Sequence, residues 1–459
     1  MVMDFSAANV ELWRPMIQIG ILAGLILLAN VLRRKVTFFR RSMMPTAVLA
    51  GFLLLFLRAS GLVDMSGEFL ESVTYHALAL GFIALSLRTP EKTVGSSAPA
   101  YKNGALIVST YLVQAVVGLA VSLFFAYTFY PDFFKASGVL LAMAYGQGPG
   151  QANNVGGMYE ALGMVGGKSF GLSLAAVGYL VACVVGVVYM NILNRKKVLK
   201  RHFDRVEVSG SVTVDEFQQP NEIPVAESLD RLSVQAALIC LVYLLSYLLI
   251  WAVVTVLEAF APGVANTVSS LLWGFNFIVG SIMAMLCRGM ISGLQNIRVM
   301  KRQYQNNYLL SRLSGLAFDV MIVAGIASIN ISDLAGNWVP FVTMAVVGGV
   351  VTFFYLLFMS RKLYKGYEYE GFFSMFGMLT GTISSGVLLL REIDPELKTP
   401  ASNNLITGSS FGIVFGLPVL LLVNFAGQGD AQTYWTLILA AAYLVVLLII
   451  MLKPGKKKK

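Results

Sequence analysis

The chain has 459 residues, of which 57% are hydrophobic and 13% charged, with a mean hydropathy of +0.73 and a formal net charge of +10. A soluble protein of this length carries roughly twice that charged fraction, so the composition excludes the soluble class. Apolar runs long enough to cross a bilayer recur along the whole sequence and predict an all-α polytopic membrane protein. The three cysteines show no CxxC spacing and the two histidines are far apart, so neither a disulfide framework nor a transition-metal site is expected.

About 11 apolar segments are predicted to be transmembrane helices. They are 15–32, 43–57, 70–87, 103–129, 168–194, 232–257, 267–287, 308–331, 338–359, 403–425 and 433–452. The first is expected to be an uncleaved span, because the N-terminus lacks a basic region and a small-residue cleavage site. Two further segments, 136–163 and 370–392, are hydrophobic but broken by glycine and polar residues, and we expect each to be a re-entrant hairpin that returns to the side from which it enters.

The distribution of basic residues predicts the orientation. If both broken segments are hairpins, 30 of the 34 Lys and Arg lie on one side of the membrane, and the other side keeps only Arg14, Arg58, Lys135 and Lys168. The positive-inside rule then predicts a multi-pass protein of the plasma (inner) membrane with its N-terminus outside and its C-terminus in the cytoplasm. In this arrangement the basic excess faces the headgroups of the lipid bilayer, so a nucleic-acid partner is not expected.

The sequence divides into two membrane halves, 1–194 and 232–425, which contain the first and the second hairpin. The segment 195–231 is basic and then mixed in charge, with little apolar content, and is predicted to be a flexible cytoplasmic linker. The segment 426–459 is predicted to add a C-terminal helix and a basic tail.

The two halves contain a repeat. The sequence "AVVGLAVSLFF" at 115–125 matches "AVVGGVVTFFY" at 345–355 with a constant offset of 230, and a broken segment follows each. The predicted orientations of the two copies are opposite. Together these features predict an inverted-topology repeat, the architecture of many secondary transporters.

The broken segments carry the candidate substrate site. The first contains "YGQGPGQANNVGGMYE" at 145–160 and the second "FGMLTGTISSGVLLLRE" at 376–392. Non-helical backbone at membrane depth survives only where protein buries it or where it lines a wet cavity, so we expect the two tips to meet near the midplane. Half-helix N-termini after each tip suit a carboxylate. The candidate substrate-binding residues are Gly146, Gln147, Gly148, Gly150, Gln151, Asn153, Asn154, Thr380, Gly381, Thr382, Ser384, Ser385 and Arg391.

Oxygen-rich groups near the tips suggest a Na⁺ site. Asp319 is the one acidic residue well inside a span outside the hairpins, which makes it a candidate cation ligand or proton carrier, although a structural role for its carboxylate stays open. The alternative for the tips is that their glycines allow close helix packing and their hydroxyls bond to the preceding turn. The candidate cation ligands are Asp319, Thr382, Ser384, Asn403, Asn404 and Thr407.

Several motifs resemble those of the bacterial sodium:glutamate symporter family. The stretch "RRKVTFFRRSMMPTAVLAGFLLLF" is similar to the family's basic loop and the start of its second span. "GQGPGQA" resembles the family's "GHGTGAA" hairpin, with Gln147 in the histidine position and Pro149 in the threonine position. "YEYEGFFSMFGMLTGTISSG" resembles the approach to the second hairpin, with "TISS" in place of a Thr-Pro-Thr run. The order of elements is shared along about residues 15–425.

The resemblance implies a homodimer with an elevator-like carrier, in which each protomer holds its substrate and Na⁺ between the hairpin tips. It also implies cotransport of an amino-acid dicarboxylate. The moving unit is expected to contain the hairpins and the spans 103–129, 168–194, 338–359 and 403–425, with the other spans as its scaffold.

The expected function is that of a sodium-coupled symporter of a small carboxylate, such as the amino acid glutamate, with Na⁺ as the coupling ion and no other cofactor. The alternative is a proton-coupled antiporter or exporter of an organic acid that uses Asp319. An enzyme is not expected, because the sequence has no metal-ligand cluster, no GxSxG motif and no acidic pair on the face of a span.

Overall fold

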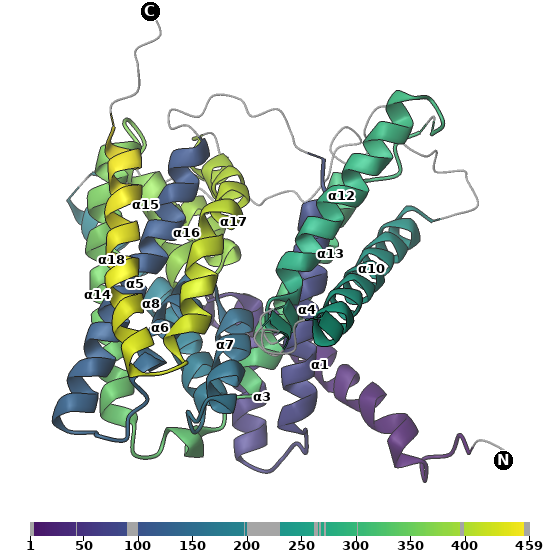
Figure 1. The fold of residues 1–459 in the computed structure, drawn as a ribbon, viewed down its shortest axis with the longest axis horizontal. Coiled ribbons are helices and arrows are strands. Elements are labelled where there is room, and N and C mark those ends of the chain that lie inside the picture. Colours follow the sequence, from purple (N-terminus) through teal and green to yellow (C-terminus); the bar gives the residue numbers. More distant parts are fainter. Residues whose placement is uncertain are drawn as a thin grey trace, which may run out of the picture. The chain divides into compact units, whose positions relative to one another are not determined.

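The fold is built from helices (Figure 1). The computed structural model describes residues 4–42, 44–89, 100–196, 198–199, 230–260, 265, 268–269, 272–300, 302–394 and 399–453, and these residues form no β-strand. The elements are α1 (Val10–Lys35), α2 (Thr37–Ser42), α3 (Thr46–Ala59), α4 (Gly67–Leu87), α5 (Ala100–Thr128), η1 (Lys135–Gly138), α6 (Val139–Leu141), η2 (Ala142–Gly146), α7 (Pro149–Ala161), α8 (Gly167–Arg195), α10 (Arg231–Phe260), α12 (Asn276–Asn296), α13 (Asn307–Ala327), η3 (Ile331–Leu334), α14 (Trp338–Leu363), α15 (Glu368–Thr380), α16 (Ile383–Arg391), α17 (Ala401–Ala426) and α18 (Asp430–Leu452).

Length and composition confirm the predicted class, an all-α membrane protein. Within the described ranges, nine helices are long and apolar enough to cross a membrane. The predicted span 43–57 corresponds to the shorter apolar helix Thr46–Ala59, and the predicted span 403–425 lies within α17, Ala401–Ala426. The predicted span 267–287 lies earlier in the sequence than α12, which begins at Asn276 and continues to Asn296. Most of the predicted linker 195–231 lies outside the described residues.

The chain forms two compact units. The first contains Met1–Glu71, Thr93–Arg205 and Ile322–Lys459, and the second contains Ser72–Lys92 and Val206–Met321. Each unit therefore takes segments from both halves of the sequence, and the boundary between the units falls inside α4 and inside α13.

In the first unit, α5 is the central helix and runs antiparallel to α14. The Tyr355 hydroxyl donates to Ser109 Oγ over 2.7 Å, and the Tyr364 hydroxyl donates to Asn103 Oδ1 over 3.1 Å. The residue nearer the end of α14, Tyr364, bonds to the residue nearer the start of α5, Asn103. The two helices are therefore antiparallel. The two copies of the repeated sequence lie on these two helices and so have opposite directions, as predicted.

The C-terminal helix α18 also packs along α5, in the first unit (Figure 1). At one end, Lys102 Nζ donates to the carbonyl oxygens of Met451 and Lys453, over 2.7 and 2.9 Å. At the other end, Lys135 pairs with Asp430, and this hydrogen bond raises the pKa of Lys135. The expected moving unit left this helix out, and the sequence could not place it because α18 is apolar around its whole circumference.

Glycine allows the first broken segment to lie directly against α5. A Cβ atom on Gly118 would overlap the carbonyl oxygen of Gly138, and a Cβ on Gly138 would overlap the backbone of Gly118. Gly348, the repeat partner of Gly118 on α14, packs against the side chain of Leu141 in the same segment. Both copies of the repeat therefore use a glycine to hold the first broken segment.

The second unit has its own apolar core, formed by α4, α10, α12 and α13. Ser314 Oγ of α13 donates to the Gly81 carbonyl of α4 over 2.9 Å, and a Cβ on Gly81 would meet the ring of Phe318. The buried core side chains are Ile83, Ala84, Leu87, Ile239, Val242, Ala284 and Leu310.

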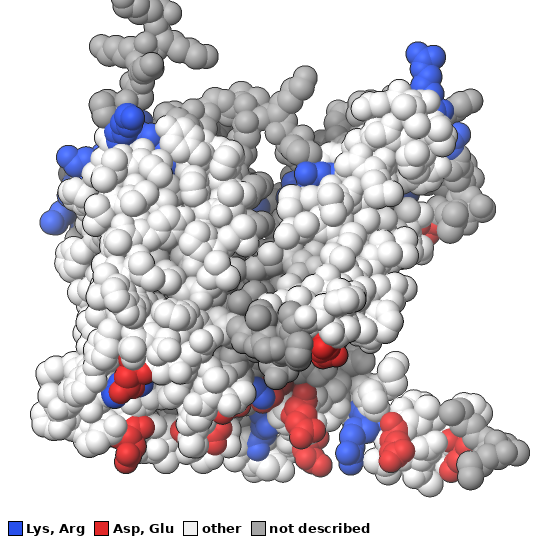
Figure 2. All heavy atoms as spheres, viewed as in Figure 1, with Lys and Arg blue, Asp and Glu red and all other residues white. Residues whose placement is uncertain are grey.

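Charges separate along the first unit. Figure 2 shows Lys and Arg gathered over the end of α18 that carries the C-terminus, and acidic side chains toward the opposite end. The basic end includes Lys102, Lys362 and Lys453, whereas Asp333 and Asp430 belong to the other end. This separation within one unit follows the predicted charge asymmetry.

We expect Gly118→Ala to lower the free energy of unfolding by about 1–3 kcal/mol, because the added methyl group has no space against Gly138. The matched control is Gly24→Ala, since a Cβ at that position in α1 would meet nothing within 4 Å. That control should be neutral or stabilising by up to about 1 kcal/mol. Thermal unfolding of the purified protein in detergent measures both, and equal effects of the two substitutions would contradict the tight contact.

Candidate functional site

The first broken segment changes direction at Gly148. This residue has φ +85°, a left-handed value that glycine adopts without strain, and Pro149 occupies the first turn of α7. No side chain caps the start of α7. Because Pro149 has no N–H, the first-turn N–H groups of Gly150 and Gln151 are the donors at this helix end.

The second broken segment changes direction at Gly381 and Thr382, between α15 and α16. Thr382 is extended and precedes the first residue of α16, where a threonine hydroxyl ordinarily accepts from the first turn. Here the hydroxyl makes no such bond, and its oxygen is buried without a partner among the described residues. The start of α16 is therefore also uncapped by a side chain.

The two tips meet. The Cβ position of Gly148 lies 3.7 Å from the Gly381 carbonyl oxygen and 3.7 Å from Cγ2 of Thr382. Two uncapped helix starts, at Pro149 and at Ile383, thus lie next to the same junction. The structure brings these predicted residues of the two segments together.

Helix α8 packs into this junction. A Cβ on Gly178 would overlap the carbonyl oxygen of Thr380, so α8 approaches the end of α15 at backbone distance. The next residue, Tyr179, is fully buried, and its ring lies 3.0 Å from the Cβ position of Gly381 while its hydroxyl lies 4.0 Å from that of Gly148. One tyrosine on a continuous helix therefore contacts both breaks.

Buried polar atoms without hydrogen-bond partners gather in these segments. Both amide atoms of Gln151 lack a partner among the described residues, and so does Oδ1 of Asn153, although the two residues are only 1% and 6% exposed. Other such atoms include Oγ of Ser137 at the start of the first segment, Oγ of Ser173 on α8, Oγ1 of Thr382 and Oγ of Ser385. Each unpaired buried polar atom costs about 1–3 kcal/mol, so the cluster suits a ligand that supplies the missing partners.

Gln114 on α5 is a residue that the sequence analysis missed. Its Nε2 donates to the Leu379 carbonyl of α15 over 2.8 Å and to Thr352 Oγ1 of α14 over 3.1 Å. Its Oε1 has no partner among the described residues and lies 2.9 Å from the Cβ position of Gly146. In the sequence, the only indication of a role for Gln114 is that it is a single amide inside the apolar stretch "YLVQAVV".

Other predicted site residues lie away from the tips. Arg391 is exposed at the last turn of α16, about 12 Å along the helix from its start. Asn404 donates to the Tyr367 hydroxyl over 3.0 Å, at the beginning of α15 and about 20 Å from its end at Thr380. The Thr380 hydroxyl donates to the Phe376 carbonyl of its own helix, over 2.7 Å.

The remaining predicted residues fall into three groups. Asp319 belongs to the second unit. The side chains of Ser384, Asn403 and Thr407 lie outside the described residues. Gln147 is half-buried at the first tip, and Asn154 is buried inside α7.

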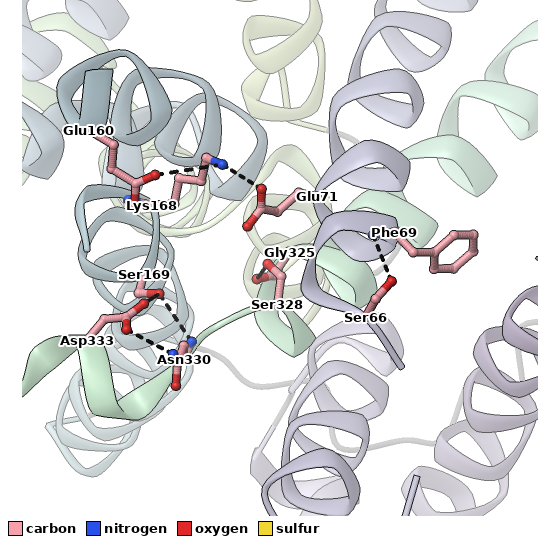
Figure 3. A network of polar contacts seen from close by, with 10 residues as sticks. All are labelled: Ser66, Phe69, Glu71, Glu160, Lys168, Ser169, Gly325, Ser328, Asn330 and Asp333. Carbon is pink, nitrogen blue, oxygen red and sulfur yellow. Dashed lines mark hydrogen bonds and ion pairs between the residues drawn. The ribbon is translucent and has the colours of Figure 1, made fainter. Parts of the chain in front are cut away.

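A polar network holds the connection between α7 and α8 (Figure 3). Lys168, in the first turn of α8, places Nζ 2.6 Å from Glu71 Oε2 of α4 and 3.7 Å from Glu160 Oε2 of α7. The adjacent Ser169 donates to Asp333 Oδ2 of η3 over 2.7 Å. The start of α8 is therefore bonded to α4, α7 and η3, which positions the helix that reaches both breaks.

The arrangement can hold an anion and a cation side by side. Two uncapped helix starts present N–H groups and partial positive charge, which favour a carboxylate. The unpaired amide and hydroxyl oxygens favour a hard monovalent cation or polar groups of an organic ligand. Among the described residues, no group of three or more His, Cys, Asp and Glu could hold a metal ion.

Comparison of the sequence with protein-family models and with curated proteins finds no match.

We expect Ser385→Ala to leave the free energy of unfolding unchanged or to raise it, because the substitution removes a buried hydroxyl that has no partner. The matched control is Ser374→Ala on the opposing helix, whose buried hydroxyl donates to the Gly371 carbonyl over 3.0 Å. That control should lower the free energy of unfolding by about 1 kcal/mol. Thermal unfolding without added ligand measures both, and an equal cost for the two substitutions would show that Ser385 has a structural role instead.

A double-mutant cycle tests the ion pair that holds α8. Lys168→Met and Glu71→Gln should each destabilise the first unit and show a coupling energy of about 1 kcal/mol, because the 2.6 Å pair is partly buried. The cycle of Lys168→Met with Glu160→Gln is the control and should give a smaller coupling, since Nζ is 3.7 Å from that carboxylate. Equal couplings would contradict the geometry.

Proposed function

We propose that the chain is a sodium-coupled secondary transporter that moves a small carboxylate, such as the amino acid glutamate, by alternating access. The observation that carries this proposal is the meeting of two broken helices at Gly148 and at Gly381–Thr382. In a soluble protein, water can pair the backbone and side-chain atoms of such breaks. In a membrane protein the breaks are favoured only where they line a cavity or hold a ligand.

The substrate carboxylate binds at the starts of α7 and α16. The first-turn N–H groups of Gly150, Gln151 and Ser385 donate to its oxygens, in the way that helix N-termini bind anions elsewhere. The side chain of Gln151 supplies both a donor and an acceptor for the remaining polar groups of the substrate. Support for this assignment comes from the lack of a side-chain cap at either helix start and from the unpaired amide of Gln151.

Na⁺ binds beside the substrate, through oxygens of the same tips. The hydroxyls of Thr382 and Ser385 and the amide oxygen of Gln114 are the ligands that we propose, because these buried oxygens have no partner among the described residues. A cation and an anion that share one site stabilise the same state of the protein, so each raises the affinity for the other. The Na⁺ gradient thereby drives uptake of the carboxylate.

The broken segments are re-entrant hairpins in this proposal. Support comes from their ends: Lys135 at the start of the first segment pairs with Asp430, and Tyr159 near its end donates to the Val423 carbonyl over 2.7 Å. Both ends therefore lie near the connection between α17 and α18. The second segment begins beside Asn404, in the first turn of α17, which is the next helix in the chain.

The hairpins and α5, α8, α14 and α17 form the moving part of an inverted-topology repeat, and we now add α18 to this part because Lys102 and Tyr127, near the two ends of α5, bond to Met451 and Tyr434 of α18. In this proposal the chain is a member of the bacterial sodium:glutamate symporter family and a homodimer of the inner membrane, with its N-terminus outside and its C-terminus in the cytoplasm. The charge separation of the first unit supports this orientation.

Uptake of labelled L-glutamate into proteoliposomes tests the function. An inward Na⁺ gradient should drive accumulation, and an equal K⁺ gradient should not. Thr382→Val and Asn153→Leu should reduce the initial rate at least tenfold, because each removes a polar group from the tip cluster. Ser374→Ala, away from the tips, serves as the control and should keep the rate within about twofold.

The outcomes test sodium coupling, the substrate and the binding site separately. Na⁺-independent uptake would contradict sodium coupling, and no uptake under any gradient would rule out glutamate. In the second case, a thermal-shift series of other carboxylates with and without Na⁺ follows. If no carboxylate raises the unfolding temperature in either series, the proposed site is wrong.

A further inference from the structure

A second polar cluster lies in the second unit, where it joins three helices. Nδ1 of His76 on α4 lies 2.7 Å from the hydroxyl of Tyr243 on α10. Asn276, at the start of α12, donates from Nδ2 to the same hydroxyl over 3.2 Å. Asn276 is 3% exposed, and its Oδ1 has no partner among the described residues. An imidazole is thus connected to a buried amide through one tyrosine.

The donors and acceptors available determine the direction of each hydrogen bond between Asn276, Tyr243 and His76. The Tyr243 oxygen accepts the Asn276 N–H, so the single tyrosine proton is directed to Nδ1 of His76, which accepts it. The neutral imidazole then carries its own proton on Nε2. In this state Oδ1 of Asn276 is buried without a partner among the described residues.

Adding a proton to the imidazole reverses the donor and acceptor roles in these hydrogen bonds without breaking them. The imidazolium has N–H donors on both nitrogens, so Nδ1 donates to the Tyr243 oxygen. The tyrosine proton turns to Asn276, whose amide rotates by half a turn and accepts it through Oδ1. The number of hydrogen bonds is the same in both states, and so is the number of unpaired amide atoms.

We infer that His76 is a proton-binding site, and that Tyr243 and Asn276 let it gain and lose a proton without losing its contacts. Histidine changes charge between pH 5 and 8, the range in which a membrane protein meets changing proton concentrations. The ligand of this site is a single proton, and its acceptor atom is Nδ1 of His76.

The groups that face His76 support a site that can hold the charge. On its own helix, the Tyr75 hydroxyl is engaged with the Trp273 carbonyl over 2.7 Å. From α10, Tyr243 and Tyr247 are the titratable groups on this side, and the ring of Tyr247 packs against Trp273 at 5.5 Å. From α12, Asn276 carries no charge.

Helix α13 contributes a carboxylate at the same level. It runs antiparallel to α4, since Asn307 bonds to Thr89 and Ser314 bonds to Gly81. Asp319 follows Ser314 by five residues, and His76 precedes Gly81 by five residues. The Asp319 carboxyl group therefore lies on the neighbouring helix at about the level of His76.

The proton-binding residue His76 lies on α4. Five residues before His76, the same helix carries Glu71, which pairs with Lys168 in the first unit. His76 and Glu71 therefore lie five residues apart on one helix. The consequence for transport rests on the proposed function: the uptake rate should depend on pH through His76.

Nuclear magnetic resonance of a single-histidine protein tests proton binding directly. The chain has two histidines, so His202→Gln leaves His76 as the only one. With ¹⁵N-labelled histidine in lipid nanodiscs, the neutral ring should show a hydrogen-bonded acceptor at Nδ1 and a proton on Nε2. Both resonances should move together to the imidazolium position between pH 8 and 5.

Tyr243→Phe in the same background is the specific comparison. It removes the partner of Nδ1, so the acceptor shift of this nitrogen should disappear and the midpoint of the titration should change by at least half a pH unit. Tyr247→Phe is the matched control on α10 and should change neither. A ring that stays in one protonation state from pH 8 to 5, or a titration that Tyr243→Phe leaves unchanged, would overturn the inference.

Uptake measurements distinguish this inference from the proposed function. His76→Gln should flatten the pH profile of glutamate uptake while keeping Na⁺ dependence. If no substrate is taken up at any pH but the resonances titrate as described, the proposed function fails and the proton site stands. If uptake is Na⁺-dependent but His76 does not titrate, the proton site fails and the proposed function stands.

Discussion

The structure depends on how interrupted helices satisfy their backbone polar groups inside an apolar protein. A continuous helix pairs its own N–H and C=O groups, but a break leaves several of them at each new helix end. Here two breaks, at Gly148 and at Gly381–Thr382, are placed against each other and against α8. The uncapped helix ends, which would be unfavourable singly, lie together at one junction.

The close approach of the surrounding helices requires residues without a side chain at the contacts. Gly118 meets Gly138, and Gly178 meets the carbonyl of Thr380, so α5 and α8 lie against the broken segments at backbone distance. Gln114 then ties the end of α15 to α5 and α14 through side-chain bonds. This packing holds the tips against α5 and α8, while several of their buried polar atoms have no partner among the described residues.

The two polar clusters have different chemistry. The cluster at the tips consists of amides, hydroxyls and helix ends, which bind ions and carboxylates without changing protonation. The cluster of His76, Tyr243 and Asn276 in the second unit contains an imidazole and a chain of donors that can reverse. Helix α4 carries His76 five residues after Glu71, the residue that pairs with Lys168. The histidine cluster therefore offers a group that titrates near neutral pH, which the cluster at the tips lacks.

The sequence by itself determined the class of the protein and the positions of the two broken segments, because hydropathy and the distribution of glycine are local properties of the chain. It indicated Gly148, Gln151 and Thr382, but it did not indicate Gln114 or Tyr179, which look like ordinary residues of apolar helices. Only the tertiary structure decided that Tyr179 contacts both tips, that Asn404 lies beside Tyr367, and that α18 belongs with α5. The physical reason is that an apolar helix can pack on any of its faces, so its partners depend on close contacts between residues far apart in the chain.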